Sequence, residues 1–184
     1  MSASTSAPLF LAAKPVWQRS EETTMNRTLT FCADLDGAAA NAVLYVAGAS
    51  SYIVTVNGRL IAHGPQRCAH GYYRADALPL GAHLRPGANT VAIRVAGYNC
   101  NSFSYLDQPS FCCAEIRDGD RVLAYTAEPL HGFRASVCTA RIQKVQRFSF
   151  QRTFVESYDL AAGDFACETG GYGAECVIAE TQPK

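Results

Sequence analysis

The 184-residue sequence has no excess charge of either sign, no long apolar run and no low-complexity tract. Sixteen basic residues balance sixteen acidic ones, so the chain has no electrostatic means of gathering polyanions. This balance disfavours binding to nucleic acid or to an anionic membrane. No stretch approaches the roughly 20 apolar residues that a membrane-spanning helix needs. With 48% hydrophobic and 17% charged residues, the chain is neither disordered nor a coiled coil.

The first residues also lack the features of an export signal. No charged residue precedes Lys14, and the apolar run at 9–13 is short, whereas a signal peptide needs a basic start and about 7–15 apolar residues. We therefore expect a cytoplasmic location, with residues 1–14 as a flexible lead-in.

The eight cysteines are an even number, which in a secreted chain is typical of a disulfide framework. Without an export signal we expect a reducing compartment, and therefore free thiols and no disulfide. A zinc site built from His63, Cys68 and His70 is the alternative. Their spacing matches no tight C-x2-C ligand pair, so we expect neither a metal nor another cofactor.

Helical periodicity is missing as well, since no run of a dozen residues keeps it, but short alternating runs are frequent. The clearest run places Tyr52, Val54 and Val56 on one face and leads directly into Asn57-Gly58. An Asn-Gly pair after such a run predicts a type I′ hairpin, because both central residues of this turn need a positive φ.

Further turn signals divide the rest of the chain. Arg85-Pro86-Gly87-Ala88 suits a type II turn, and the run after it places Val91, Ile93 and Val95 on one face. Asp118-Gly119-Asp120 predicts a second hairpin. The expected strands are 29–35, 42–47, 52–56, 60–63, 91–98, 112–117, 121–126 and 145–154. Short strands with turns every 8–12 residues predict an all-β, antiparallel β-sandwich of jelly-roll type.

The order of these motifs resembles a known module. A strand ending in VNG, a return strand with HGP, an aromatic pair (Tyr72, Tyr73) ahead of Asp76, and then LRPGANTVAIRV resemble the accessory β-sandwich near the N-terminus of bacterial α-L-rhamnosidases. More distantly, they are similar to the sugar-binding domain of β-galactosidases and β-glucuronidases. The resemblance implies a galactose-binding-domain-like sandwich at 15–160, and a linker or the start of a following domain at 161–184.

Catalysis is not expected from this chain alone. The catalytic residues of the resembled family lie in a helical barrel further along, and glycoside hydrolysis needs two carboxyl groups at roughly 5–9.5 Å. The acidic residues here lie mostly in turns: Asp76, Asp107, Asp118 and Asp120. Glu156 is the other candidate, but Arg152 on the same expected strand face offers it an ion pair. No G-x-S-x-G, G-x-x-x-x-G-K or G-x-G-x-x-G motif is present.

The segment GYNCNSFSYLDQPSF, which follows an apolar strand, is the richest in binding chemistry. An aromatic ring packs against the C–H face of a sugar, while amides and carboxylates bind its hydroxyls. The candidate binding residues are Tyr98, Asn99, Asn101, Tyr105, Asp107 and Gln108. The same residue types are also ordinary turn formers. Tyr72 and Tyr73 alternate faces, so we expect one in the core and one exposed, and Arg67 reaches either a ligand or a nearby carbonyl.

Three functions are consistent with these observations. The first is an accessory module of an α-L-rhamnosidase-like glycoside hydrolase, which packs on the catalytic domain and contacts neutral carbohydrate. The second is a free-standing carbohydrate- or protein-binding sandwich. The third, a complete small enzyme, is disfavoured because paired carboxylates are missing. A reading frame that continues past Lys184 into helical-barrel sequence would distinguish the first from the second, and we expect that it does.

Overall fold

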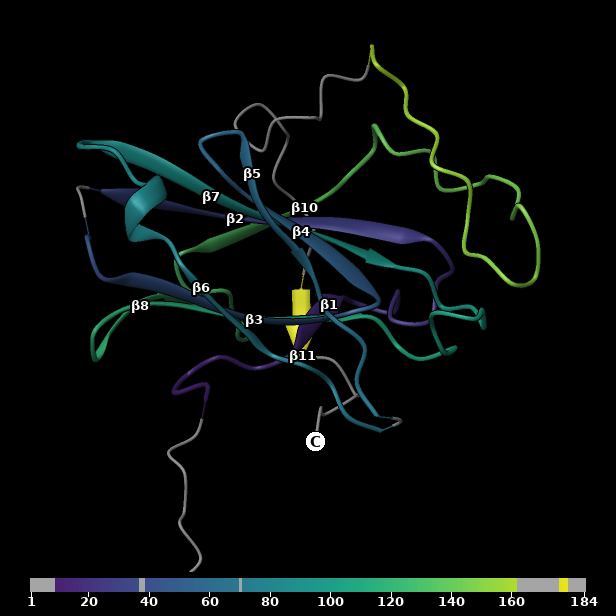
Figure 1. Cartoon of the computed structure of the whole chain (residues 1–184), viewed down its shortest axis with the longest axis horizontal. Coiled ribbons are helices and arrows are strands. Elements are labelled where there is room, and N and C mark those ends of the chain that lie inside the picture. Colours follow the sequence, from purple (N-terminus) through teal and green to yellow (C-terminus); the bar gives the residue numbers. More distant parts are fainter. Residues whose placement is uncertain (1–8, 37–38, 70, 162–175, 179–184) are drawn as a thin grey trace, which may run out of the picture.

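The computed structural model describes residues 9–36, 39–69, 71–161 and 176–178. Two antiparallel sheets pack face to face (Figure 1). One sheet has the strand order β11-β1-β8-β3-β6, with β9 also paired to β8, and the other has the order β10-β2-β7-β4-β5. The predicted all-β, antiparallel sandwich is confirmed, while its finer jelly-roll type stays a prediction.

The strand bounds are as follows. The first sheet contains β1 (Val16–Gln18), β3 (Ala42–Ala49), β6 (Asp76–Pro79), β8 (Phe111–Asp118), β9 (Arg121–Tyr125) and β11 (Cys176–Ile178). The second contains β2 (Arg27–Asp36), β4 (Ser51–Val56), β5 (Arg59–Gly64), β7 (Ala88–Gly97) and β10 (Phe133–Val137). A 3-10 turn, η1 (Gly81–His83), precedes β7. Within the described ranges, no helix is long and apolar enough to cross a bilayer.

Seven of the eight predicted strands correspond to β2, β3, β4, β5, β7, β8 and β9. The eighth, at 145–154, is wrong, because that segment forms only an isolated bridge between Arg147 and Phe154. The remaining strands, β1, β6, β10 and β11, have three to five residues each. A run this short shows too little alternation to be found in the sequence.

The core lies between the two sheets, and β4 and β7 supply it as predicted. Their alternate residues are all at most 2% exposed: Tyr52, Val54, Val56, Val91, Ile93 and Val95. The antiparallel register places Val54 opposite Ile93 and Tyr52 opposite Val95. Because a one-residue slip would turn each of these side chains to the other face of the sheet, core burial fixes the register.

The predicted turns have the backbone conformations that their sequences demand. Asn57 and Gly58 have φ values of 51° and 77°, as the two central residues of a type I′ turn require. The Asn57 side chain also accepts a hydrogen bond from the backbone N–H of Thr90 at 3.0 Å. This contact ties the hairpin to β7. Gly87 and Gly119 likewise have positive φ values, of 84° and 61°.

The prediction that all cysteines are free thiols is wrong, because Cys32 on β2 is disulfide-bonded. Among the residues whose side chains the structure describes, the free cysteines are Cys68, Cys100, Cys112, Cys113 and Cys138. Cys32 follows the core residue Phe31, so its side chain lies on the opposite face of β2, and yet it is fully buried. Other parts of the chain therefore cover this face, a long-range contact that cysteine spacing does not reveal.

Candidate functional site

Three chain crossings between the sheets meet at one end of the sandwich (Figure 1). They are the short β3–β4 connection, the β5–β6 loop (residues 65–75) and the β7–β8 loop (residues 98–110). Because β3 is antiparallel to both β6 and β8, its end lies beside their beginnings. The topology therefore places the two long loops side by side.

A pocket of about 550 Å³ lies between these two loops. Gly48 near the end of β3 and Ser50 of the β3–β4 connection, both buried, line it. The β5–β6 loop contributes Pro65, Gln66, Arg67, Cys68, Ala69, Gly71, Tyr72, Tyr73 and Arg74. The β7–β8 loop contributes Ser104, Tyr105, Leu106 and Gln108. This is the size of cavity in which proteins bind small molecules.

Two of the six predicted binding residues, Tyr105 and Gln108, line this pocket. Gln108 accepts a hydrogen bond through Oε1 from the Tyr73 hydroxyl at 3.2 Å. The rings of Tyr105 and Tyr98 pack in a T-shaped arrangement with their centroids 5.1 Å apart. Tyr98 itself is half-buried and does not line the pocket, and burial raises the pKa of its phenol to about 12.

Asn99, Asn101 and Asp107 of the predicted set do not line the pocket but shape the β7–β8 loop. Asn99 is buried, has a φ of 44°, and donates to the Ser110 hydroxyl at 2.8 Å. Asn101 accepts through Oδ1 from the backbone N–H of Asp107 at 2.9 Å, which closes the loop on itself. The turn-forming role that these residue types commonly have is the one the geometry gives them.

The β5–β6 loop supplies the most exposed ring of the pocket. Tyr72 is 63% exposed, whereas Tyr73 is half-buried and its ring makes a T-shaped contact with that of Phe111, with the ring centroids 4.8 Å apart. The expectation that one of this pair packs on the core and the other is exposed is confirmed. Arg67 donates through Nη2 to the Ser104 hydroxyl at 2.9 Å, so it bridges the two loops.

The start of the β5–β6 loop is fixed by a close approach of backbone to ring. A Cβ atom at Gly64 would lie 2.5 Å from the Tyr52 hydroxyl oxygen, so only glycine fits there. The Tyr52 hydroxyl donates to Asp76, which also pairs with Arg74 at 2.8 Å. Burial and this hydrogen bond raise the pKa of Tyr52 above its ordinary range. The loop therefore leaves and re-enters the sheets at anchored positions.

A second cavity, of about 470 Å³, adjoins the first at Ser104 and Tyr105. Its other side is formed by residues of the 148–154 segment, among them Phe148 and Phe154. Arg147 donates through Nη2 to the carbonyl oxygens of Asn101, Phe150 and Arg152 at 2.6, 2.8 and 2.8 Å. Two carbonyl oxygens of the 145–154 segment, those of Phe150 and Arg152, are therefore bound by this guanidinium.

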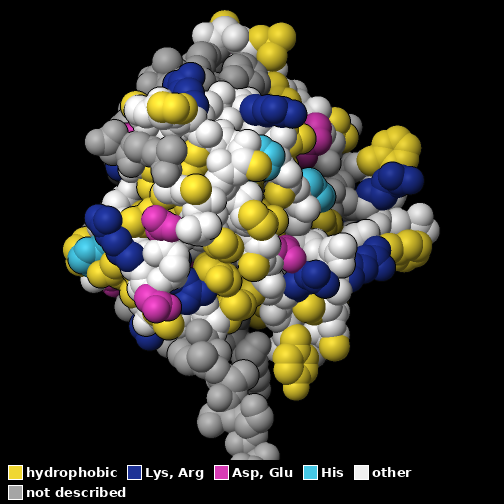
Figure 2. All heavy atoms as spheres, turned by 60° about the vertical axis from the view of Figure 1, so that its left-hand side comes forward, with side chains coloured by type: hydrophobic (Ala, Val, Ile, Leu, Met, Phe, Trp, Pro, Cys, Tyr) yellow, Lys and Arg dark blue, Asp and Glu magenta, His cyan; other side chains and the backbone are white. Residues whose placement is uncertain are grey.

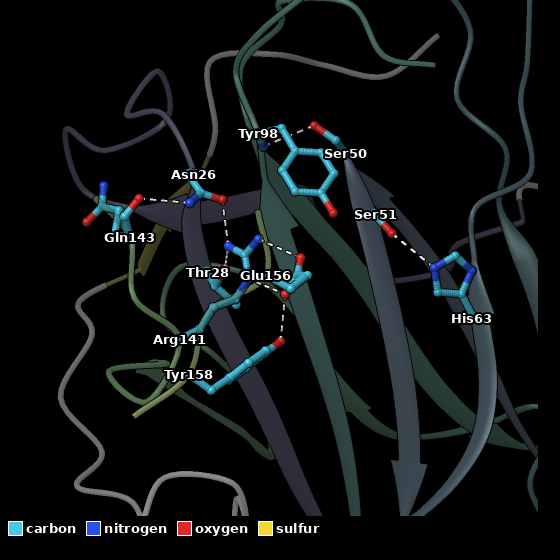
Figure 3. Close-up of polar contacts among 10 residues, drawn as sticks. All are labelled: Asn26, Thr28, Ser50, Ser51, His63, Tyr98, Arg141, Gln143, Glu156 and Tyr158. Carbon is cyan, nitrogen blue, oxygen red and sulfur yellow. Dashed lines mark hydrogen bonds and ion pairs between the residues drawn. The ribbon is translucent and has the colours of Figure 1, made fainter. Parts of the chain in front are cut away.

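A buried arginine, Arg141, holds the segment around Glu156 against the second sheet (Figure 3). Arg141 is 5% exposed and donates through Nη1 to Asn26 at 2.6 Å and Thr28 at 3.0 Å. Its Nε and Nη2 bind the two carboxylate oxygens of Glu156 at 3.0 and 2.8 Å. Glu156 thus pairs with Arg141, and the predicted pairing with Arg152 is wrong because the expected strand face does not form.

The serine–histidine contact in Figure 3 is not an activated nucleophile. Ser51 Oγ lies 3.4 Å from His63 Nε2 and also donates to the Gly64 carbonyl at 3.3 Å. A hydroxyl that donates to a carbonyl does not offer its proton to the imidazole, as nucleophilic catalysis requires. The contact stabilises the pairing of β4 with β5.

Of the three residues considered for the alternative zinc site, His70 lies outside the described residues. Within the described part of the chain, no group of three or more His, Cys, Asp or Glu side chains is placed to hold a metal ion. Figure 2 shows basic, acidic and hydrophobic side chains interspersed over one face of the molecule, with no continuous region of one charge.

Fold and pocket together define a small β-sandwich module with a cavity between the loops at one end. The GH78 family rhamnosidase of Bacillus sp. GL1 matches 91% of this chain with a TM-score of 0.78 and 27% identity. The α-L-rhamnosidase of Aspergillus terreus matches 92% with a TM-score of 0.62 and 15% identity. That of Dictyoglumus thermophilum matches 91% with a TM-score of 0.52 and 12% identity.

This chain spans only 18%, 21% and 21% of those three chains. It is therefore similar to an accessory domain of α-L-rhamnosidases, as its sequence motifs predicted. The matches to the Aspergillus and Dictyoglumus enzymes, at 15% and 12% identity, show a similarity of fold alone. No family model matches the sequence, and no curated protein matches it.

Proposed function

We propose that the chain is a non-catalytic accessory module of an α-L-rhamnosidase-like glycoside hydrolase, and that it binds an oligosaccharide of mainly neutral sugars in the pocket between the β5–β6 and β7–β8 loops. The observation that carries this proposal is the lining of the pocket. The exposed ring of Tyr72 lies in one cavity with the amide of Gln108 and the guanidinium of Arg67. Such a set suits a sugar, whose C–H face packs on a ring while its hydroxyls meet polar groups.

The same lining supports a binding role over a catalytic one. Among the described residues, neither an aspartate nor a glutamate lines the pocket. Hydrolysis of a glycosidic bond needs two carboxyl groups placed across it. A pocket that offers rings, amides and guanidinium groups instead binds a sugar without cleaving it.

An NMR titration tests the proposal. Rhamnose-containing oligosaccharides should shift amide signals of residues 65–74 and 104–108, with a Kd in the mM range, or about −4 kcal/mol. Tyr72→Ala should abolish these shifts, whereas Leu60→Ala, which removes another exposed apolar side chain at the far end of β5, should keep them. Shifts confined to the Asn57-Gly58 hairpin would place the site elsewhere. An unshifted spectrum at high ligand concentration would exclude sugar binding.

A second candidate function, docking on the catalytic domain of the parent protein, has an observation of its own. Phe103, Phe148 and Phe150 are 70%, 78% and 75% exposed. The rings of Phe103 and Phe150 meet edge to face at 6.5 Å. Clustered exposed aromatic side chains mark interaction surfaces, and a neighbouring domain of the same protein is the partner that the rhamnosidase likeness suggests.

Hydrogen exchange tests the docking function. If the gene encodes a catalytic domain after this module, the amides of residues 147–152 should exchange more slowly in the full-length protein than in the isolated module. Phe148→Asp in the full-length protein should restore fast exchange, because a buried carboxylate would open the interface. Equal exchange in both proteins would exclude docking at this surface.

A further inference from the structure

The pocket differs in charge from the chain that forms it. The whole chain is neutral, with sixteen residues of each sign, but the described lining of the pocket holds Arg67 and Arg74 and no carboxylate. Overall neutrality therefore hides a local excess of positive charge. A cavity with walls of one charge sign attracts ligands of the opposite sign.

The two arginines are not equivalent. Arg74 Nε lies 2.8 Å from Asp76 Oδ1, so a carboxylate beside the pocket already neutralises it. Arg67 bonds to an uncharged group, the Ser104 hydroxyl. No carboxylate of the described residues lies within ion-pair distance of Arg67, so its charge is the one left for a ligand.

The Arg67 guanidinium also retains the donors that a carboxylate prefers. Its hydrogen bond to Ser104 uses Nη2, which leaves the Nε and Nη1 groups to donate. Guanidinium groups bind carboxylates through two parallel N–H···O bonds, and this makes them more selective than a point charge. The hydrogen bond to Ser104 places the guanidinium between the two loops.

We propose that the oligosaccharide bound in this pocket carries a carboxylate, as a uronic acid residue does, and that this carboxylate pairs with Arg67. The inference rests on the proposed function. A sugar ring on Tyr72 and a carboxylate on Arg67 fit one ligand, because both residues line the same cavity of about 550 Å³. The amides of Gln66 and Gln108 in the same lining bind the hydroxyls.

Matched ligands provide the first test. Affinity is measured by NMR for a rhamnose-containing disaccharide with a uronic acid residue, and for the same disaccharide with that carboxylate reduced to an alcohol. The acidic form should bind about fivefold tighter at low salt, as one partly exposed charge pair allows. This advantage should shrink at about 0.5 M salt, where the Debye length is a few ångströms.

Matched variants provide the second test. Arg67→Gln should remove the preference for the acidic form, so that this variant binds the acidic and the reduced disaccharide with equal affinity, whatever affinity for sugar it retains. Arg67→Lys keeps the charge but loses the bidentate geometry, so it should retain part of the preference for the acidic disaccharide. Arg121→Gln in the β8–β9 hairpin removes an exposed arginine at the other end of the sandwich and should retain the whole of this preference.

Cys68 gives a readout independent of NMR, because this free, exposed cysteine lines the pocket. Bound acidic disaccharide should slow the alkylation of Cys68, followed by mass spectrometry of its peptide. Acetate and an acidic peptide serve as competing anions. If they bind and protect as well as the acidic sugar, the pocket is a general anion site and the inference is overturned.

The outcomes separate the two proposals. Equal binding of the acidic and reduced disaccharides, with shifts in both loops and no effect of Arg67→Gln, overturns the carboxylate inference and leaves sugar binding intact. Binding of neither disaccharide overturns sugar binding, and the carboxylate inference fails with it.

Discussion

Replacing Glu156 by glutamine should weaken the attachment of the segment around this residue to the second sheet. The carboxylate of Glu156 accepts two hydrogen bonds from Arg141, at 2.8 and 3.0 Å, and a third from the Tyr158 hydroxyl at 2.9 Å. Glutamine keeps the shape but offers one acceptor oxygen and no charge. Hydrogen bonds to charged groups contribute about 1.5–3 kcal/mol each when buried.

The Glu156 side chain is 51% exposed, while that of Arg141 is 3% exposed. Solvent screens a half-exposed carboxylate, so we expect a loss of about 1–2 kcal/mol in the free energy of unfolding rather than the full buried value. For a domain of this size, such a loss lowers Tm by roughly 2–8 °C. Glu128→Gln, at an exposed pair with Arg19 separated by 3.6 Å, is the matched control and should leave Tm nearly unchanged.

The effect should depend on pH with a definite sign. The hydrogen bonds from Arg141 hold the pKa of Glu156 below its ordinary value of 4.5. A lowered pKa stabilises the folded state above the ordinary pKa, and this contribution is lost as pH falls through the folded pKa. Urea unfolding at pH 7 should therefore separate wild type from Glu156→Gln, and the difference should shrink as pH falls from 4.5 and vanish below the lowered pKa of Glu156. Equal stability at pH 7, or a gap that persists in acid, would refute this account of Arg141.

Three further measurements address the fold. Because Cys32 is disulfide-bonded, no more than six of the eight cysteines should react with a thiol reagent in denaturant without reductant, and eight reactive thiols would exclude the bond. Gly64→Ala places a Cβ 2.5 Å from the Tyr52 hydroxyl and should cost about 1–3 kcal/mol in urea unfolding; unchanged stability would contradict the close approach. Glu115→Gln removes the fully buried carboxylate that binds the N–H groups of residues 11–13 and should cost about 2–3 kcal/mol. It should also speed proteolysis near residue 11, and an unchanged cleavage rate would argue against this anchor.

The parts of the fold that the sequence predicts are those that local rules decide. The hairpin at Asn57-Gly58 follows from two residues that tolerate positive φ, next to a run that alternates between a buried and an open face. Each of the seven correctly predicted strands has such a run or a turn signal beside it. The short strands β1 and β6 instead exist because β8 and β3 lie beside them, and no local pattern encodes a neighbour that far along the chain.

The candidate site was only half predictable for the same reason. Composition alone singles out the β7–β8 loop, since aromatic and amide side chains concentrate there. Which of those side chains face a cavity depends on the β5–β6 loop, and the hydrogen bond from Arg67 to Ser104 spans 37 positions. Asn99 and Asn101 have the same residue type as a sugar-binding amide, yet Asn101 binds its own loop, and Asn99 binds Ser110 of that loop and the Thr24 carbonyl.

The wrong strand at 145–154 and the docking function have a common origin. Alternating aromatic residues predict a strand because alternation indicates one apolar face, and an apolar face is usually covered by the chain that carries it. Here Arg147 binds the carbonyls of the segment, and Phe148 and Phe150 stay 78% and 75% exposed. Covering both rings would contribute about 1.5–3 kcal/mol each, which is enough to hold two domains of one protein together. The alternation therefore marks exposed aromatic side chains and not a strand face, and in the docking function proposed above a neighbouring domain of the parent protein covers these rings.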